Sequence, residues 1–389
     1  MLADLPAQPA DALLALIKLY AADERADKID LGVGVYRTGQ GETPVFGAIK
    51  GAEKKLYETQ DSKAYLGPEG DMGFVEALKP HIFGTGFAAI DRIDGMQTPG
   101  GTGAVRLAVG LAKKAGITRV IMGTPSWPNH AQILKDLDLE VVTFNHAKDG
   151  AVDMNAVKAA IADAGATDAI LLHGCCHNPT GIDYSNDDWD AIAALLADKG
   201  LLPILDLAYQ GLGDGMEADA YGVRKVMATV PEALLAYSCD KNFGLYRDRV
   251  GAVYVMADKD QLPAIMSNGA ALARANWSMP PDHGAAAVRL ILEDEALTAQ
   301  WLDELDQMRT RMRQVRDKLA AAGTAGGVDM VPYGTQNGLF AMLPLSSEQI
   351  LALRNDHAIY MAGSGRINVA GLTMGNIDKF IDAVAAVSA

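Results

Sequence analysis

Residues 202–207, Leu202-Pro203-Ile204-Leu205-Asp206-Leu207, form an apolar run with one acidic residue near its end. A continuous apolar run of this length predicts a strand buried on both faces of a sheet. Similar runs recur between about residue 100 and residue 260, separated by segments with helical spacing such as Asp187–Lys199. These runs are Val120–Met122, Val141–Phe144, Ala169–His173, Ala233–Ser238 and Gly251–Met256. The alternation predicts an α/β fold with a large, mostly parallel sheet covered by helices, whose ligands bind beyond the carboxyl ends of the strands.

The composition limits the classes of function. The chain has 389 residues, of which 49% are hydrophobic and 21% charged, so it can bury a large core in about two or three units. A net charge of −15 repels nucleic acid and anionic membrane surfaces. There is no basic signal segment at the N-terminus, no run of ~18 apolar residues, and too few cysteines for a disulfide framework. We therefore expect a soluble, cytoplasmic protein without nucleic-acid or membrane partners.

A long, charged helical pattern from Leu297 to about Ala322 predicts a connector between two domains. The residues after it have the pattern of a smaller α+β unit. We expect the boundary near residue 306. Residues 45–306 would then form a large domain, and residues 1–44 and 307–389 would together form a small domain built from both chain ends.

The glycine-rich segment Thr98-Pro99-Gly100-Gly101-Thr102-Gly103 leads into a helical pattern that begins at Ala104. Glycines let backbone N–H groups approach an anion, and a helix N-terminus adds partial positive charge. The segment is therefore either a phosphate site or an ordinary turn. The chain contains neither the P-loop nor the dinucleotide-binding glycine pattern, so these fingerprints do not decide between the two.

The segment His173-Gly174-Cys175-Cys176-His177-Asn178-Pro179-Thr180-Gly181 follows a predicted strand. Two histidines and two cysteines this close together raise the question of a metal site. An extended chain, however, sends Cys175 and Cys176 to opposite faces, and no second Cys/His cluster completes a tetrahedral set. We therefore predict no metal, and interpret residues 178–181 as a rigid turn whose Asn178 amide points at a ligand.

Two charged residues lie at the ends of predicted strands. Asp206 needs a cationic or hydrogen-bonding partner if it is buried, and a protonated ring nitrogen of a ligand would supply one, although Asp206 could equally cap the next loop. Lys241 follows the apolar run Ala233–Ser238, where partial burial favours a neutral, nucleophilic amine. A lone lysine in this position is more often a surface residue, so its neighbours decide the interpretation.

Together these segments resemble the class I aspartate and aromatic aminotransferases, which are pyridoxal-phosphate-dependent transferases of fold type I. The resemblance extends over nearly the whole chain and rests on several long motifs in the same order. The motifs are Asp30–Tyr36, Tyr65–Gly67, Ser126–His130, His173–Gly181, Asp206–Gly211, Ser238–Tyr246, Arg274–Pro281 and Ser364–Gly371. The resemblance implies pyridoxal 5'-phosphate as cofactor and a ping-pong transamination.

The resemblance also implies roles for residues that contact the cofactor. Lys241 would hold it as a Schiff base and then move a proton between the substrate Cα and the cofactor. Asp206 would keep the ring nitrogen protonated, with His130 and His177 close to Asp206. The other implied contacts are Asn178 and Tyr209 at the phenolic oxygen, Trp127 on the ring, Tyr65 from a neighbouring subunit, and Gly101, Thr102, Ser238 and Arg249 at the phosphate.

A substrate site follows from the same resemblance. Arg366 would hold the α-carboxylate and Arg274 a side-chain carboxylate. Because Tyr65 and Arg274 would cross from the neighbouring subunit, a homodimer with shared active sites is implied. The small-molecule partners would be amino acids and 2-oxo acids such as 2-oxoglutarate. The implied substrate contacts are Gly34, Trp127, Asn178, Arg274 and Arg366.

Three positions depart from the family pattern. Asp240 stands where relatives often carry Ser, Met279 where aspartate-specific members carry Asn, and Ala64 where a polar residue is common. The last two leave two substrate preferences open, a broad aromatic and dicarboxylic enzyme or a dedicated aspartate aminotransferase. A lyase or decarboxylase on the same fold is disfavoured by the paired arginines. A non-catalytic sensor is disfavoured because the segment before Asp30 is too short for a DNA-binding domain.

Overall fold

A seven-stranded sheet forms the centre of the computed structural model, which describes residues 2–7 and 12–389. Its spatial order is β2 (Ile93–Pro99), β10 (Val250–Met256), β9 (Ala233–Ser238), β8 (Leu202–Leu207), β7 (Asp168–His173), β3 (Arg119–Thr124) and β4 (Glu140–Asn145). Strand β10 runs antiparallel to both of its neighbours, and the other adjacent pairs are parallel. The predicted mostly parallel α/β sheet is therefore confirmed.

Strand β2 is the one strand of this sheet that the apolar pattern did not predict. Its sequence, Ile93-Asp94-Gly95-Met96-Gln97-Thr98-Pro99, mixes polar and apolar residues. Gln97 is nevertheless fully buried. Its side chain accepts a hydrogen bond from the Asp71 N–H at 2.8 Å and donates one to the Pro281 carbonyl at 2.7 Å. Buried polar groups with such partners are tolerated in a sheet, and hydropathy alone does not reveal them.

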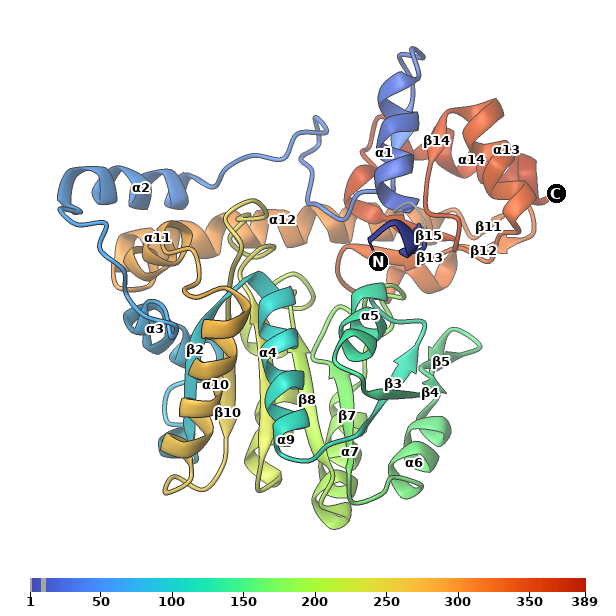
Figure 1. The fold of residues 1–389 in the computed structure, drawn as a ribbon. Helices are drawn as coiled ribbons and strands as arrows, with labels where there is room; N and C mark the ends of the chain where they lie inside the picture. The colour runs from blue at the N-terminus through green and yellow to red at the C-terminus, as the bar shows by residue number, and fades with distance from the viewer. Residues whose placement is uncertain (1, 8–11) are drawn as a thin grey trace.

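Helices cover both faces of the sheet (Figure 1). Successive side chains of a strand point to opposite faces, so Ile204 and Leu205 belong to different hydrophobic clusters. The cluster around Ile204 includes helices α4 (Gly100–Lys114), α5 (Pro128–Asp136) and α10 (Leu262–Asn276). The cluster around Leu205 includes α2 (Gly47–Thr59), α3 (Met72–Phe83), α7 (Asn186–Lys199), α9 (Tyr221–Thr229) and α11 (His283–Leu292).

A third hydrophobic cluster combines the two ends of the chain. Ile29 and Leu31 pack there with buried residues from Val315 to Val384. Strand β1 (Ile29–Asp30) pairs in parallel with β14 (Ile359–Tyr360), and β13 (Phe340–Met342) pairs with β15 (Arg366–Asn368). Helix α12 (Glu295–Ala321) runs from beside α11 to this group of elements (Figure 1). The predicted boundary near residue 306 falls inside α12, and the division into two domains stays a prediction.

Residue 1 and residues 8–11 of the predicted small domain lie outside the described residues. The remaining regular elements are α1 (Ala12–Ala22), β5 (Ala147–Lys148), β6 (Ala151–Val152), α6 (Met154–Ala162), α8 (Met216–Asp219), β11 (Thr324–Ala325), β12 (Val328–Asp329), α13 (Ser347–His357) and α14 (Ile377–Ser388), with short 3₁₀ turns between some of them. Within the described part of the chain, no helix combines the length and apolar character that crossing a bilayer requires.

Candidate active site

A cavity of about 140 Å³ opens at the edge of the sheet where the parallel strands end. Asp206 is the penultimate residue of β8, and Lys241 lies just after β9. Arg249 immediately precedes β10, which starts at this edge because it runs antiparallel. The cavity is lined by Gly34, Gly101, Thr102, Trp127, His173, Asn178, Asp206, Ala208, Tyr209, Asp240, Lys241, Tyr246 and Arg249. Most of the residues proposed from the sequence therefore converge here.

The glycine-rich segment starts a helix earlier than predicted. Helix α4 begins at Gly100 rather than at Ala104, so Gly101 and Thr102 belong to its first turn. The prediction was wrong because glycine has a low helix propensity, whereas tertiary packing decides this helix start. A Cβ on Gly101 would lie 2.9 Å from the Ser238 Cβ, so only glycine fits against the end of β9. The N–H groups of this first turn face a site that suits an anion.

The partly exposed Lys241 and the buried Asp206 both face the cavity. The Lys241 Nζ lies 5.4 Å from the centre of the Tyr209 ring. Burial lowers the pKa of Lys241, and the nearby Asp240 and Asp206 charges oppose that shift. Burial alone would raise the pKa of Asp206, but the hydrogen bond and charge of His130, together with His173 and Lys241, bring it below its ordinary value. Asp206 therefore stays ionised at neutral pH.

A chain of hydrogen bonds leads from Asp206 into the protein interior. The Asp206 Oδ2 lies 2.8 Å from the His130 Nε2. The Ser126 Oγ bridges two histidines: it lies 3.0 Å from the His130 Nδ1 and 2.9 Å from the His173 Nε2. His177 lies beyond His173, with ring centres 4.2 Å apart, and stacks on His146 at 3.6 Å. Of the two histidines expected beside Asp206, His130 makes the direct contact, and His173 takes the position expected for His177.

Near the cavity, Asn178 and Arg366 each have a polar atom without a hydrogen-bond partner among the described residues. The Asn178 Nδ2 lies 3.4 Å from the Tyr209 Oη, while its buried Oδ1 has no hydrogen-bond partner among the described residues. Arg366 donates to the Gly32 carbonyl at 2.8 Å and lies over the Phe340 ring, 4.6 Å from its centre. Its Nε is buried and also lacks a partner in the described part of the chain. Buried groups of this kind ordinarily bind a ligand or water.

Tyr65 and Arg274 lie outside the cavity. Tyr65 is 92% exposed, and the exposed Arg274 donates a hydrogen bond to the Ser278 Oγ at 2.8 Å. The Met279 Sδ lies 3.2 Å from the Leu66 N, so the two segments that carry Tyr65 and Arg274 touch each other. Within a single chain, these two residues form a surface separate from the residues around Lys241.

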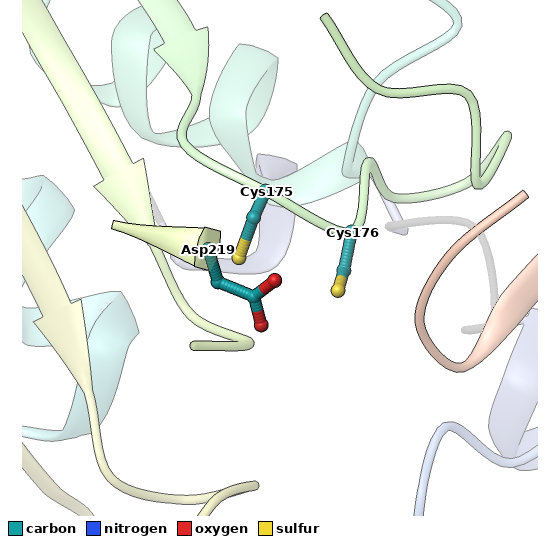
Figure 2. A group of neighbouring side chains, drawn as sticks. All are labelled: Cys175, Cys176 and Asp219. Carbon is teal, nitrogen blue, oxygen red and sulfur yellow. The ribbon is translucent and has the colours of Figure 1, made fainter. Parts of the chain in front are cut away.

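The expectation that Cys175 and Cys176 point to opposite faces was wrong. Both sulfur atoms lie beside the carboxylate of Asp219, and the three groups are within 4.8 Å of one another (Figure 2). The strand ends at His173, and Cys176 adopts a positive φ of 48°, so the alternation of an extended chain no longer applies. The Asp219 oxygens already accept hydrogen bonds from the N–H groups of Gly211, Gly213 and Asp214. Burial raises the pKa of Cys176, which disfavours a thiolate ligand.

Known proteins match the chain over most of its length. A family model of the class I and II aminotransferases matches residues 26–384. The chain is 48% identical to a tyrosine aminotransferase of Rhizobium meliloti (strain 1021) over 370 residues, which are 94% of each protein. The chain belongs to the class I and II aminotransferases.

Two further comparisons place this aminotransferase among characterised relatives. It is 42% identical to the aspartate aminotransferase of Escherichia coli (strain K12) over 395 residues, covering 100% of both proteins. The crystal structure of an aromatic-amino-acid aminotransferase from Burkholderia pseudomallei, covalently bound to pyridoxal phosphate, superposes with a TM-score of 0.96 at 32% identity and covers 100% of both chains. The fold of this aminotransferase is therefore that of the pyridoxal-phosphate transferases of fold type I.

Class I aminotransferases depend on pyridoxal 5'-phosphate, and the residues around the cavity fit that cofactor. The first turn of α4 offers N–H groups to a phosphate beside Ser238, with room that a Cβ on Gly101 would remove. The free Asn178 Oδ1 and the ionised Asp206 offer partners to polar atoms of a ring. This aminotransferase therefore uses pyridoxal 5'-phosphate.

Phe340 and Tyr246 are site residues that the sequence did not reveal. The Tyr246 Oη accepts a hydrogen bond from the Tyr36 N–H at 2.9 Å, across 210 positions of sequence. Phe340 contacts the Tyr209 ring and fills the space that a side chain at Gly34 would need, since a Cβ there would lie 2.7 Å from the Phe340 Cζ. Tyr246 is the last residue of the Ser238–Tyr246 motif, whereas no local pattern marks Phe340.

Proposed function

We propose that this aminotransferase moves amino groups between aromatic or dicarboxylic amino acids and 2-oxo acids such as 2-oxoglutarate, by a ping-pong mechanism. The observation that carries the proposal is the Lys241 amine, whose pKa is lowered by desolvation, in the same cavity as Asp206 and the N-terminus of α4. Relatives named tyrosine aminotransferase and aspartate aminotransferase support both classes of substrate.

Lys241, Asp206 and Tyr209 are the residues that we assign to catalysis. When bound, pyridoxal phosphate supplies the carbon that receives the amino group and the ring that delocalises electrons. Lys241 attaches the cofactor and moves the proton at the substrate Cα, because desolvation makes its amine a better base and nucleophile at neutral pH. Asp206, held ionised by its hydrogen bond to His130, would keep a proton on the ring nitrogen of a bound cofactor. Burial raises the pKa of Tyr209, so its hydroxyl, next to Asn178, stays protonated and would donate to the phenolic oxygen of a bound cofactor.

The phosphate group is assigned to four residues at one end of the cavity. Gly101 and Thr102 supply backbone N–H groups from the first turn of α4, where the helix dipole favours an anion. Ser238, which lies against Gly101, supplies a hydroxyl. Arg249 lines the same cavity and supplies a charged donor. Together they would fix the position of a bound cofactor's ring relative to Lys241.

The substrate carboxylate is assigned to Arg366. Its Nε, which has no partner among the described residues, is a donor that a substrate carboxylate can accept from. Gly34 lines the cavity, where its lack of a side chain lets Phe340 pack against it, and Trp127 forms a wall of the cavity that would stack on the cofactor ring. A bound substrate thus has its α-carboxylate fixed at one end and its Cα directed towards Lys241.

The functional unit is proposed to be a cytoplasmic homodimer with shared sites. Tyr65 and Arg274 lie outside the cavity of their own chain, and Tyr65 is 92% exposed. In a dimer, Tyr65 would reach the cofactor of the neighbouring chain, and Arg274 would bind the side-chain carboxylate of its substrate. A dicarboxylic substrate would then contact one arginine from each chain.

The test of the proposed function is Lys241→Ala, measured with aspartate, phenylalanine, tyrosine, tryptophan and leucine as donors and 2-oxoglutarate as acceptor. A positioned acid/base contributes ~10²–10⁴ in rate, and covalent attachment is lost as well, so turnover should fall at least that far. The visible absorption band of the bound cofactor should change position, and it should no longer respond to amino acids as it does in the native protein.

Lys259→Ala is the matched control because Lys259 is an exposed lysine after β10. It should keep native turnover with every donor. Normal turnover by a correctly folded Lys241→Ala protein would contradict the mechanism. Turnover confined to aspartate in the native protein would contradict the broad substrate range and leave the mechanism intact.

A further inference from the structure

Asp240 brings an unusual negative charge into the proposed phosphate site. It lies directly before Lys241, and only 1% of its surface is exposed. Its Oδ2 accepts a hydrogen bond from the Arg249 Nη1, and its Oδ1 accepts one from the Val250 N–H at 3.2 Å. Its own N–H donates to the Ser238 Oγ at 3.2 Å. Two of the groups assigned to the phosphate, Arg249 and Ser238, are thus bonded to this one residue.

The Asp240 carboxylate lies where an anion would be stabilised. A Cβ on Gly100 would lie 2.6 Å from the Arg249 Nη2 and 3.0 Å from the Asp240 Oδ2. The Asp240–Arg249 pair therefore packs directly against the first residue of helix α4, whose N-terminus attracts negative charge. The side chain of Arg249 is still 39% exposed, so one of its edges remains open to the cavity. The carboxylate and a bound phosphate would be neighbours around one guanidinium.

We propose that Asp240 is an internal competitor of the cofactor phosphate for Arg249, and that it lowers the affinity of this chain for phosphate groups while stabilising the cofactor-free protein. The inference rests on the proposed phosphate site. Without cofactor, the ion pair satisfies the buried carboxylate and holds Arg249 in place. With cofactor, the Asp240 carboxylate and the phosphate share the Arg249 guanidinium, and each anion weakens the binding of the other.

The alternative role for Asp240 is to orient Arg249 towards the phosphate without competing for it. A purely orienting contact would be served by any acceptor, including a neutral hydroxyl. A carboxylate adds a charge that repels phosphate, and its burial against α4 leaves no solvent to screen that repulsion. Other charges facing Asp240 are Lys241 and Arg249, and both of them also face the cavity. We therefore expect competition to outweigh orientation.

The test compares native protein with Asp240→Asn and Asp240→Ser in the full chain. Binding of inorganic phosphate and of pyridoxal phosphate to cofactor-free protein is measured by calorimetry, and retention of the visible band is measured during long dialysis of the loaded protein. Both variants should bind each probe on the order of tenfold more tightly, because a charged competitor is replaced by a neutral group. Their cofactor-free forms should melt at a lower temperature than native protein, since the ion pair is lost.

Asp248→Asn is the matched control because it removes the same charge from the same loop, next to Arg249 in sequence, and it should change phosphate affinity less than twofold. Equal or weaker phosphate binding by folded Asp240→Asn and Asp240→Ser would overturn the competition. A native protein that binds neither probe would overturn the proposed function together with this inference. Tighter binding cannot result from structural damage, so a gain in affinity separates competition from a merely structural role.

Discussion

Met279 is the residue that most directly bears on substrate preference. It is partly buried, its Sδ lies 3.2 Å from the Leu66 N, and it follows Ser278, the hydroxyl that accepts a hydrogen bond from Arg274. A thioether packs well against aromatic rings but holds a guanidinium far less firmly than an amide oxygen would. Arg274 donates to one exposed hydroxyl, so in the proposed substrate site it would turn towards water when the substrate carries no second carboxylate. An apolar wall at Met279 would then face an aromatic side chain.

We predict that Met279→Asn shifts preference from phenylalanine towards aspartate. The amide would accept a hydrogen bond from Arg274 and hold it in the substrate site, where an unpaired charge disfavours an aromatic ring. A hydrogen bond to a charged group is worth ~1.5–3 kcal/mol, so the ratio of kcat/KM for aspartate to that for phenylalanine should rise by about one to two powers of ten. Met279→Leu, which keeps an apolar wall, should leave the ratio near its native value. This role for Met279 would be contradicted if the native protein already prefers aspartate over phenylalanine by more than about a thousandfold in kcat/KM, or if Met279→Asn leaves that ratio unchanged.

At the scale of elements, the buried histidines join α5, the end of β7 and the segment after β4. Burial, followed by the charge of His130, lowers the pKa of His173 to about 3. Burial also lowers the pKa of His146 and His177. These three imidazoles are therefore neutral in the folded protein, whereas they titrate near pH 6.5 in the unfolded chain.

We predict that stability falls as the pH drops below about 6.5, because the unfolded chain then binds protons that the folded protein does not. The contribution of these neutral histidines to the free energy of unfolding is fully present above their pKa in the unfolded chain. It is lost as the pH falls from there towards their lower pKa values in the folded protein. Each such histidine costs about 1.4 kcal/mol per pH unit in this range. Melting temperatures between about pH 8 and pH 5 measure the loss. His146→Phe keeps a ring to stack on His177 but cannot take a proton, so its melting temperature should depend less on pH; identical profiles would count against this assignment.

The apolar pattern of the sequence predicts those strands that are buried on both faces. Strands β8 and β9 have the predicted bounds, because apolar side chains cover both of their faces. Hydropathy does not reveal strand β2, because the hydrogen-bond partners of its buried Gln97 are distant in sequence. It does not reveal the start of α4 either, because glycines begin this helix only where β9 packs against them. The same distinction holds in the site. Asp206 and Lys241 stand out within their own segments, whereas Phe340 contacts the cavity residues Tyr209 and Gly34 only through the folded chain.

At the scale of the whole molecule, one chain lacks part of the proposed substrate site. Arg366 lies beside the cavity through its contact with Phe340, while Arg274 and Tyr65 face outward on a separate surface. A dicarboxylic substrate needs two cationic partners at once, because a buried carboxylate without a partner costs several kcal/mol. If the second arginine comes from another chain, the oligomeric state determines activity with dicarboxylates.

We predict that Lys241→Ala and Arg274→Ala chains complement each other when they are mixed, unfolded and refolded together. In a mixed dimer, the chain that retains Lys241 would receive Arg274 from its neighbour, so one of the two sites is native. Random pairing gives mixed dimers in about half of the population, so activity with aspartate should recover to about a quarter of the native value. Each parent alone should remain far below that level. Phenylalanine activity reports on Lys241 alone and serves as the control. If isolated mixed dimers show no more aspartate activity than the parents, Arg274 acts within its own chain and the shared site is wrong.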